Sequence, residues 1–187
     1  MDWLQLVYKL PAQPSRKRVY IWRQLRGLGA FYLQDACCVL PRTPETEGQL
    51  SDVAGKVREF GGEATLSALA PAEPGWEERM VALVNRARNE EYQELLDTVE
   101  RFQEEIARET RKGKFTFAAL EEVEYEYDRL TRWTQRVQAR DLFQAERRGD
   151  AYSALESARA SLAQFAGKVY DNPESSIDTV TNGPQTL

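Results

Sequence analysis

A short stretch near the N-terminus concentrates the side chains that could bind an anion. Between Asp2 and Asp35 there is no acidic residue. The same interval carries six cations, which are Lys9, Arg16, Lys17, Arg18, Arg23 and Arg26. Guanidinium and ammonium groups donate strong hydrogen bonds to phosphate oxygens. Because the whole chain has a net charge of −5, this basic island indicates a local anionic partner. A solvated helix face that only aids solubility is the alternative.

The chain has no histidine, and this excludes many kinds of catalytic and metal-binding site. It excludes Ser-His-Asp and Cys-His catalysis, histidine general bases and every metal site with an imidazole ligand. The chain also has no P-loop, no dinucleotide-binding fingerprint and no G-x-S-x-G motif. We therefore expect a protein that is not an enzyme, with no catalytic residues, no cofactor and no bound metal.

Two other residue types could still react or bind a metal. Carboxylates gather in two clusters, Glu90, Glu91 and Glu94, and Glu121, Glu124 and Asp128. Di-iron bundles combine such carboxylates with Glu-x-x-His, so without histidine a solvated acidic face is favoured. Cys37 and Cys38 are adjacent, which argues against a disulfide between them. In a strand, one should point into the core and the other away, and packing is favoured over a redox role.

The elements that position the basic island form a β-α-β-β-α-β order. Strands are expected at residues 3–10, 31–34, 37–41 and 63–69, with helices from about 15 to 28 and from 44 to 60. Pro11 ends the first strand, Thr43 caps the second helix and Gly61-Gly62 ends it. This order is typical of a ferredoxin-like domain, an antiparallel four-stranded sheet with both helices on one face. We assign it to residues 1–70.

The first helix is expected to bury one side and to present a basic side. At 100° per residue, Ile21, Trp22, Leu25 and Leu28 fall on the apolar side. Arg16, Tyr20 and Arg23 fall on the other, so the tyrosine lies between two arginines. Such a stripe could clamp phosphates and contact a sugar or a base. The candidate DNA-binding residues are Arg16, Lys17, Arg18, Tyr20, Arg23 and Arg26.

The remainder of the chain is expected to be helical, which makes the fold class α+β. Apolar residues from Tyr92 to Ile106 recur in steps of three and four, Gly113 breaks the pattern, and Thr116 can cap the next helix. We expect an antiparallel helical hairpin and a third helix within residues 76–170. Whether residues 79–88 form a separate short helix is open. Residues 171–187 are polar and are predicted to be a disordered tail.

Several segments, taken in order, resemble the N-terminal region of ChrB-type chromate-resistance regulators. They are Trp3-Leu-Gln-Leu-Val-Tyr-Lys-Leu-Pro11, Arg18-Val-Tyr-Ile-Trp-Arg-Gln-Leu-Arg-Gly-Leu-Gly29, Val39-Leu-Pro41, Glu91-Tyr-Gln-Glu-Leu-Leu96, Gly113-Lys-Phe-Thr-Phe117 and Arg132-Trp-Thr-Gln-Arg-Val-Gln-Ala-Arg-Asp-Leu-Phe143. The resemblance runs from the start to about Tyr170. It implies a DNA-binding repressor of a chromate-efflux operon, released when chromate is sensed.

Further expectations concern the partners and the location of the chain. Family members commonly continue into a C-terminal domain associated with sensing, whereas this chain ends in a polar segment, so we expect a free-standing version that keeps the DNA-binding half. Chromate is the candidate effector only because the resemblance implies it. Double-stranded DNA is the expected partner, and a homodimer is expected because operators usually carry two-fold symmetry. No apolar stretch approaches the roughly 18 residues of a membrane span, and a cytoplasmic location is expected.

Two hypotheses compete with the regulator. The first is a non-enzymatic protein-interaction module that uses the helical hairpin. The second follows from a resemblance of the first domain to the small nuclease of CRISPR adaptation, in which an aspartate near the end of the first strand binds metal. Here that strand ends in Tyr8-Lys9-Leu10, so a metal-dependent nuclease ranks last.

Overall fold

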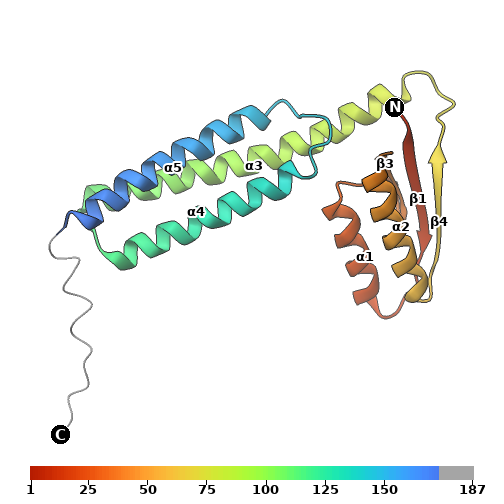
Figure 1. Cartoon of the computed structure of the whole chain (residues 1–187), viewed down its shortest axis with the longest axis horizontal. Coiled ribbons are helices and arrows are strands. Elements are labelled where there is room, and N and C mark those ends of the chain that lie inside the picture. Colours follow the sequence, from red (N-terminus) through yellow and green to blue (C-terminus); the bar gives the residue numbers. More distant parts are fainter. Residues whose placement is uncertain (173–187) are drawn as a thin grey trace, which may run out of the picture. The chain divides into compact units, whose positions relative to one another are not determined.

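The chain has a mixed α+β architecture, seen in a computed structural model that describes residues 1–172 (Figure 1). Its strands are β1 (Trp3–Lys9), β2 (Phe31–Gln34), β3 (Cys37–Pro41) and β4 (Glu63–Leu69). Its helices in the described part are α1 (Ser15–Gly27), α2 (Pro44–Glu59), α3 (Trp76–Lys112), α4 (Phe117–Gln138) and α5 (Arg148–Tyr170). The tail predicted for residues 171–187 lies outside the described residues, apart from its first two positions.

The four strands form one antiparallel sheet in the order β2-β3-β1-β4. β1 is a central strand that pairs with β3 from Trp3 to Val7 and with β4 along its whole length. β2 and β3 pair across a turn at Asp35-Ala36, in which Ala36 has a φ of 59°. The predicted connection between these two strands is therefore confirmed.

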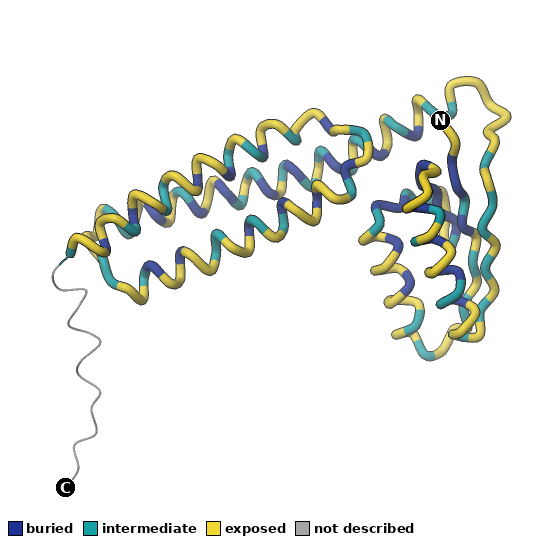
Figure 2. Tube along the Cα trace, viewed as in Figure 1, coloured by how far each residue is buried: buried dark blue, intermediate teal, exposed yellow. Residues whose placement is uncertain are grey.

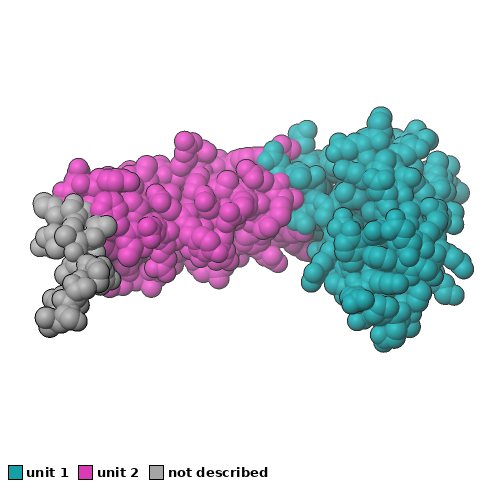
Figure 3. All heavy atoms as spheres, turned by 60° about the horizontal axis from the view of Figure 1, so that its bottom comes forward, with its two compact units in different colours: residues 1–88, 138–145 teal, residues 89–137, 146–187 magenta. Residues whose placement is uncertain are grey.

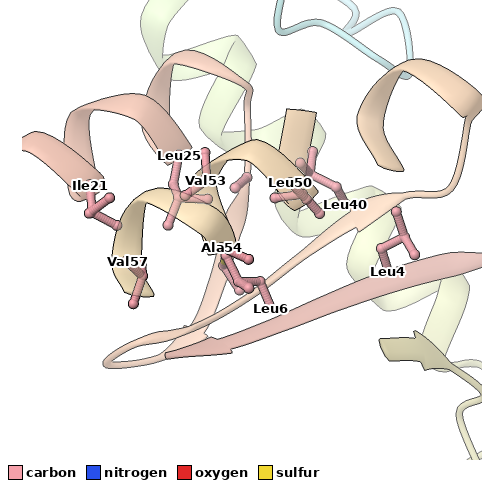
Figure 4. Packing of buried hydrophobic residues seen from close by; sticks show 11 residues of the cluster. Leu4, Leu6, Ile21, Leu25, Leu40, Leu50, Val53, Ala54 and Val57 are labelled. Atoms are coloured by element: carbon pink, nitrogen blue, oxygen red, sulfur yellow. The ribbon is translucent and has the colours of Figure 1, made fainter. Parts of the chain in front are cut away.

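Both α1 and α2 cover the same face of the sheet and enclose the main core. Leu4 and Leu6 of β1 point toward these helices and are 2% and 0% exposed. Figure 4 shows them beneath Ile21 and Leu25 of α1 and the apolar side of α2. Alternation along β1 produces this arrangement, because residues two apart share a face of the sheet. The packing fixes α1 on the sheet through one narrow apolar side.

The opposite face of the sheet is covered around Trp3 and Val39. Trp3 is 1% exposed and packs edge-on against Trp76, with 5.3 Å between the ring centroids. Val39 and Met80 belong to the same cluster. Both sides of β3 are therefore buried, and Cys37 and Cys38 are 4% and 1% exposed. Cys38 belongs to the core beneath α1 and α2, and Cys37 lies on the opposite face, as predicted, but it is buried there too and accepts a hydrogen bond from the Gln5 side chain.

Local residues set the limits of α2. Thr43 and Thr46 form a reciprocal capping box in which each side chain accepts a hydrogen bond from the other's backbone N–H. The Thr46 hydroxyl also donates to the carbonyl oxygen of Pro41, at 2.7 Å. Gly61 has a φ of +81°, which favours glycine, and a Cβ on Gly62 would collide with the carbonyl oxygen of Lys9. These residues end the helix where the sequence predicted.

The described chain divides into two compact units, coloured in Figure 3. Unit 1 comprises residues 1–88 and 138–145, and unit 2 comprises residues 89–137 and 146 onward. These units are defined by compactness. The predicted domain limits, residues 1–70 and 76–170, therefore stay a prediction. The open question about residues 79–88 is resolved, because they belong to the continuous helix α3.

Unit 2 is built from α5, nearly all of α4 and the part of α3 that follows residue 88. Phe102 of α3 packs against Tyr127 of α4, with 6.1 Å between the ring centroids. Gln103 of α3 donates to the hydroxyl of Ser157 in α5. Thr116 accepts a hydrogen bond from the Ala119 N–H at the start of α4, as the sequence predicted. Apolar residues at helical spacing therefore hold these helices together.

Replacing Thr46 by valine should destabilise unit 1 without changing its shape. The substitution keeps the side-chain volume but leaves the Pro41 carbonyl and the Thr43 N–H without this hydroxyl. We expect a loss of about 1–3 kcal/mol in the free energy of unfolding, measured by urea denaturation. Thr65→Val on the exposed side of β4 is the matched control. Equal urea midpoints for the two variants would contradict the capping account.

Candidate nucleic-acid interface

The side chains of α1 divide into three rows around its buried side. Ile21 and Leu25 define that side, and both are 0% exposed. Steps of 100° per residue then place the other residues. The rows are an outermost row of Arg16, Val19 and Arg23, a flank of Lys17 and Tyr20, and an opposite flank of Arg18, Trp22 and Arg26. Figure 2 shows that most of α1 is exposed. Five of the six candidate DNA-binding residues are exposed, and Lys17 is half-buried.

The outermost row offers two arginines that are not used by the fold. Within residues 1–172, Arg16 and Arg23 make no hydrogen bond or ion pair, and the first turn of α1 has no acidic residue. Arg42 differs, because its guanidinium pairs with Glu47 at 3.0 Å. Arg16 and Arg23 are seven residues apart, which is roughly 10 Å along the helix axis. Their guanidinium groups are therefore free to bind anions.

The flank of Lys17 and Tyr20 is fixed against the end of α2. The Lys17 ammonium donates to the carbonyl oxygen of Phe60 at 3.0 Å and lies 5.4 Å from the centroid of the Phe60 ring. Phe60 is the C-terminal cap of α2, where a cation is favourable. The Tyr20 ring packs edge-on against Phe60, with 5.6 Å between the centroids. Lys17 therefore connects α1 to α2, and Tyr20 stays 43% exposed beside it.

Trp22 lies on the other flank, and the prediction that it is buried was wrong. Its side chain is 46% exposed, and the Arg26 guanidinium lies 5.3 Å from its ring centroid. Its position around the helix axis explains this exposure. Trp22 is about 90° of helical rotation from the mean direction of Ile21, Leu25 and Leu28, which is too far to reach the sheet. The exposed side of α1 therefore carries an aromatic ring in addition to its cations.

A second basic and aromatic surface lies on α4, and it was not among the predicted sites. Arg129, Arg132 and Arg136 lie on one side of the helix, beside Trp133 and an exposed Tyr125. They line a hollow of about 460 Å³. The spacing of three and then four residues between the arginines was the available signal. Arg129 pairs with Glu126 at 2.7 Å.

The acidic clusters do not assemble a metal site. Among the residues that the structure describes, no three Asp, Glu or Cys side chains lie close enough together to hold a metal ion. Glu121, Glu124 and Asp128 are all exposed on α4. Their placement agrees with the favoured interpretation of a solvated acidic face.

The fold and the exposed basic helix together define an α+β protein with a candidate anion-binding surface. Comparison with known proteins adds the family. The family model described as "Protein ChrB, N-terminal" matches residues 18–176, and the chain belongs to that family. A curated relative, Protein ChrB of Cupriavidus metallidurans, is 32% identical over 85 residues. That alignment covers 46% of this chain and 26% of the relative, so the chain matches about a quarter of the relative's length.

Two further findings concern solved structures and membrane-spanning helices. No solved structure matches the chain. Within the described residues, none of the helices combines the length and the apolar character needed to cross a membrane.

Stability at high pH should depend on Cys38. Burial, and then the neighbouring Cys37, raise the pKa of the Cys38 thiol from 9.0 to about 12. Because the unfolded chain releases this proton near pH 9, the contribution of the neutral thiol is complete below that pH and is lost as the pH rises toward 12. We expect the urea midpoint to fall more steeply above about pH 9 in the native chain than in Cys38→Ala. Parallel pH profiles would contradict this.

Proposed function

We propose that this chain is a DNA-binding transcriptional regulator of the ChrB type, which acts on a chromate-resistance operon and has no enzymatic activity. The observation that carries the proposal is the outermost row of α1, where Arg16 and Arg23 are exposed and unpaired within residues 1–172. Family membership supports the regulatory role. The proposal includes a cytoplasmic location, a homodimer, which suits the two-fold symmetry usual in operators, and chromate as the effector, which the resemblance to the family implies.

The geometry of α1 suits a phosphate backbone. The axial distance of roughly 10 Å between Arg16 and Arg23 spans about three phosphates at the axial spacing of a DNA strand. Arg18 and Arg26 extend the same surface on one flank. Tyr20, held against Phe60, can contact a sugar or a base beside the phosphates. The bond between Lys17 and the end of α2 supports a rigid presentation of this helix.

We also infer a finer description of both units. The strand order β2-β3-β1-β4, with every neighbouring pair antiparallel and both helices on one face, supports a ferredoxin-like domain. The four-residue connection 113–116 and the packing of Phe102 on Tyr127 support an antiparallel hairpin of α3 and α4.

The competing hypothesis is a protein-interaction module. Its supporting observation is a hollow of about 430 Å³ between α3 and α4, with Phe102, Ile106 and Val123 among its walls. Such a module would leave DNA unbound at low salt. The nuclease hypothesis predicts cleavage of plasmid DNA that requires an added divalent metal.

Reversing the outermost row should abolish tight DNA binding. The test titrates a labelled duplex from the region upstream of the gene with Arg16→Glu/Arg23→Glu, and measures fluorescence anisotropy at several salt concentrations. The slope of log affinity against log salt should fall by about 0.9 for each phosphate contact removed. The matched control is Arg111→Glu/Arg159→Glu, which reverses two exposed arginines of unit 2.

The control separates a local interface from a general charge effect. We expect it to bind the duplex almost as well as the native chain. An equal loss in both double variants, or no loss in either, would contradict the proposed interface. Circular dichroism of each variant establishes that it is folded.

A further inference from the structure

A cavity of about 660 Å³ lies beside the flank of Arg18, Trp22 and Arg26. The end of β1 and the turn between β2 and β3 form its other walls. Its size falls in the range usual for small-molecule sites. All of these segments belong to unit 1. Its walls combine cations, aromatic rings and one carboxylate, and each of these favours a particular chemical group on a ligand.

The charges in the cavity favour an anion. Lys9, Arg18 and Arg26 line it together with a single carboxylate, that of Asp35. Arg18 forms no hydrogen bond or ion pair within residues 1–172. Three cations against one carboxylate give a positive site, and a guanidinium can bind two oxygens of a phosphate or carboxylate at once.

Two tyrosines provide a neutral donor in the same cavity. The hydroxyl oxygens of Tyr8 and Tyr32 lie 3.1 Å apart and share one hydrogen bond. Burial raises the pKa of both phenols, so both keep their protons at neutral pH. Two protons with only one mutual bond leave one hydroxyl proton without an acceptor among the described residues. That proton can be donated to an oxygen of a ligand.

Trp22 and Asp35 further restrict the class of ligand that fits the cavity. Trp22 is 46% exposed and carries the Arg26 guanidinium over its ring, so it offers a stacking surface beside the cations. Asp35 is an exposed acceptor at the rim, which suits a hydroxyl or amino donor. A ligand that uses every wall therefore carries a negative charge, hydroxyl groups and a planar ring.

We propose that this cavity binds a nucleoside monophosphate, with the phosphate on Lys9 and Arg18, the sugar hydroxyls toward Asp35 and the base against Trp22. The consequence for regulation rests on the proposed function. Arg18 and Arg26 belong both to the cavity and to the proposed DNA surface. A phosphate in the cavity occupies Arg18, so ligand and duplex exclude one another. The cavity is then a site through which a small molecule releases DNA.

The first experiment tests the site without DNA. Adenosine monophosphate is titrated into the full chain by calorimetry, with adenosine and inorganic phosphate as separate probes. We expect the monophosphate to bind at least tenfold more tightly than either part, because only the intact nucleotide reaches both the cations and the ring. No binding of the monophosphate, or equal binding of inorganic phosphate, overturns the proposal.

Variants locate the binding. Arg18→Glu and Trp22→Ala should each weaken the binding of adenosine monophosphate roughly tenfold or more. Arg111→Glu/Arg159→Glu, which reverses two exposed arginines of unit 2, should leave it unchanged. Trp22 is half-exposed, so Trp22→Ala should remain folded, and circular dichroism checks this. Equal affinity in the native chain and in both cavity variants places the nucleotide elsewhere and overturns the assignment.

The second experiment tests exclusion. Adenosine monophosphate is added to the preformed complex of the chain with its labelled duplex, and a fall in anisotropy is expected. The fall should disappear in Trp22→Ala, which keeps the proposed phosphate contacts. If the nucleotide binds through Trp22 and Arg18 but the duplex stays bound, exclusion is wrong. If the chain binds no duplex at all, the proposed function fails, whereas the calorimetric result for the cavity still stands.

Discussion

The burial of the start of β1 on both faces is the constraint on which unit 1 depends. β1 pairs with β3 on one edge and with β4 on the other, so its backbone has no free edge along Trp3 to Val7. Leu4 and Leu6 hold α1 and α2 on one face, while Trp3 packs against Trp76 on the other. Full burial of a leucine side chain contributes about 1.5–3 kcal/mol. This packing fixes the position of α1 and therefore of its outer side chains.

The fold uses some cations of α1 and leaves others available. The Lys17 ammonium donates a hydrogen bond to the carbonyl oxygen at the end of α2, and the Arg26 guanidinium lies over the Trp22 ring. Arg16 and Arg23 have no such use within the described residues. Because an unpaired surface cation gains little from the fold itself, its placement on a rigid helix favours recognition of an external anion. The same distinction separates Arg16 and Arg23, the central proposed DNA contacts, from Lys17, which holds the helix in place.

Features set by local sequence could be predicted, and features set by distant segments could not. Thr43 and Gly61-Gly62 determine the ends of α2 through bonds and backbone angles within a few residues. The contact between Lys17 and Phe60 joins residues 43 positions apart, and no periodicity reveals it. The burial of Trp3 likewise depends on Trp76 and Met80 at the start of α3, far along the chain. The cavity beside α1 likewise requires three separate segments.

The most direct test of the account is to observe which residues of the free chain respond to DNA. Amide ¹H–¹⁵N spectra of the chain, recorded during titration with the upstream duplex, report each backbone position separately. The account predicts that the largest shifts fall at residues 16–26 and that added salt reverses them. Shifts confined to α3 and α4, with α1 unchanged, would contradict it and would place the interaction on the helical unit.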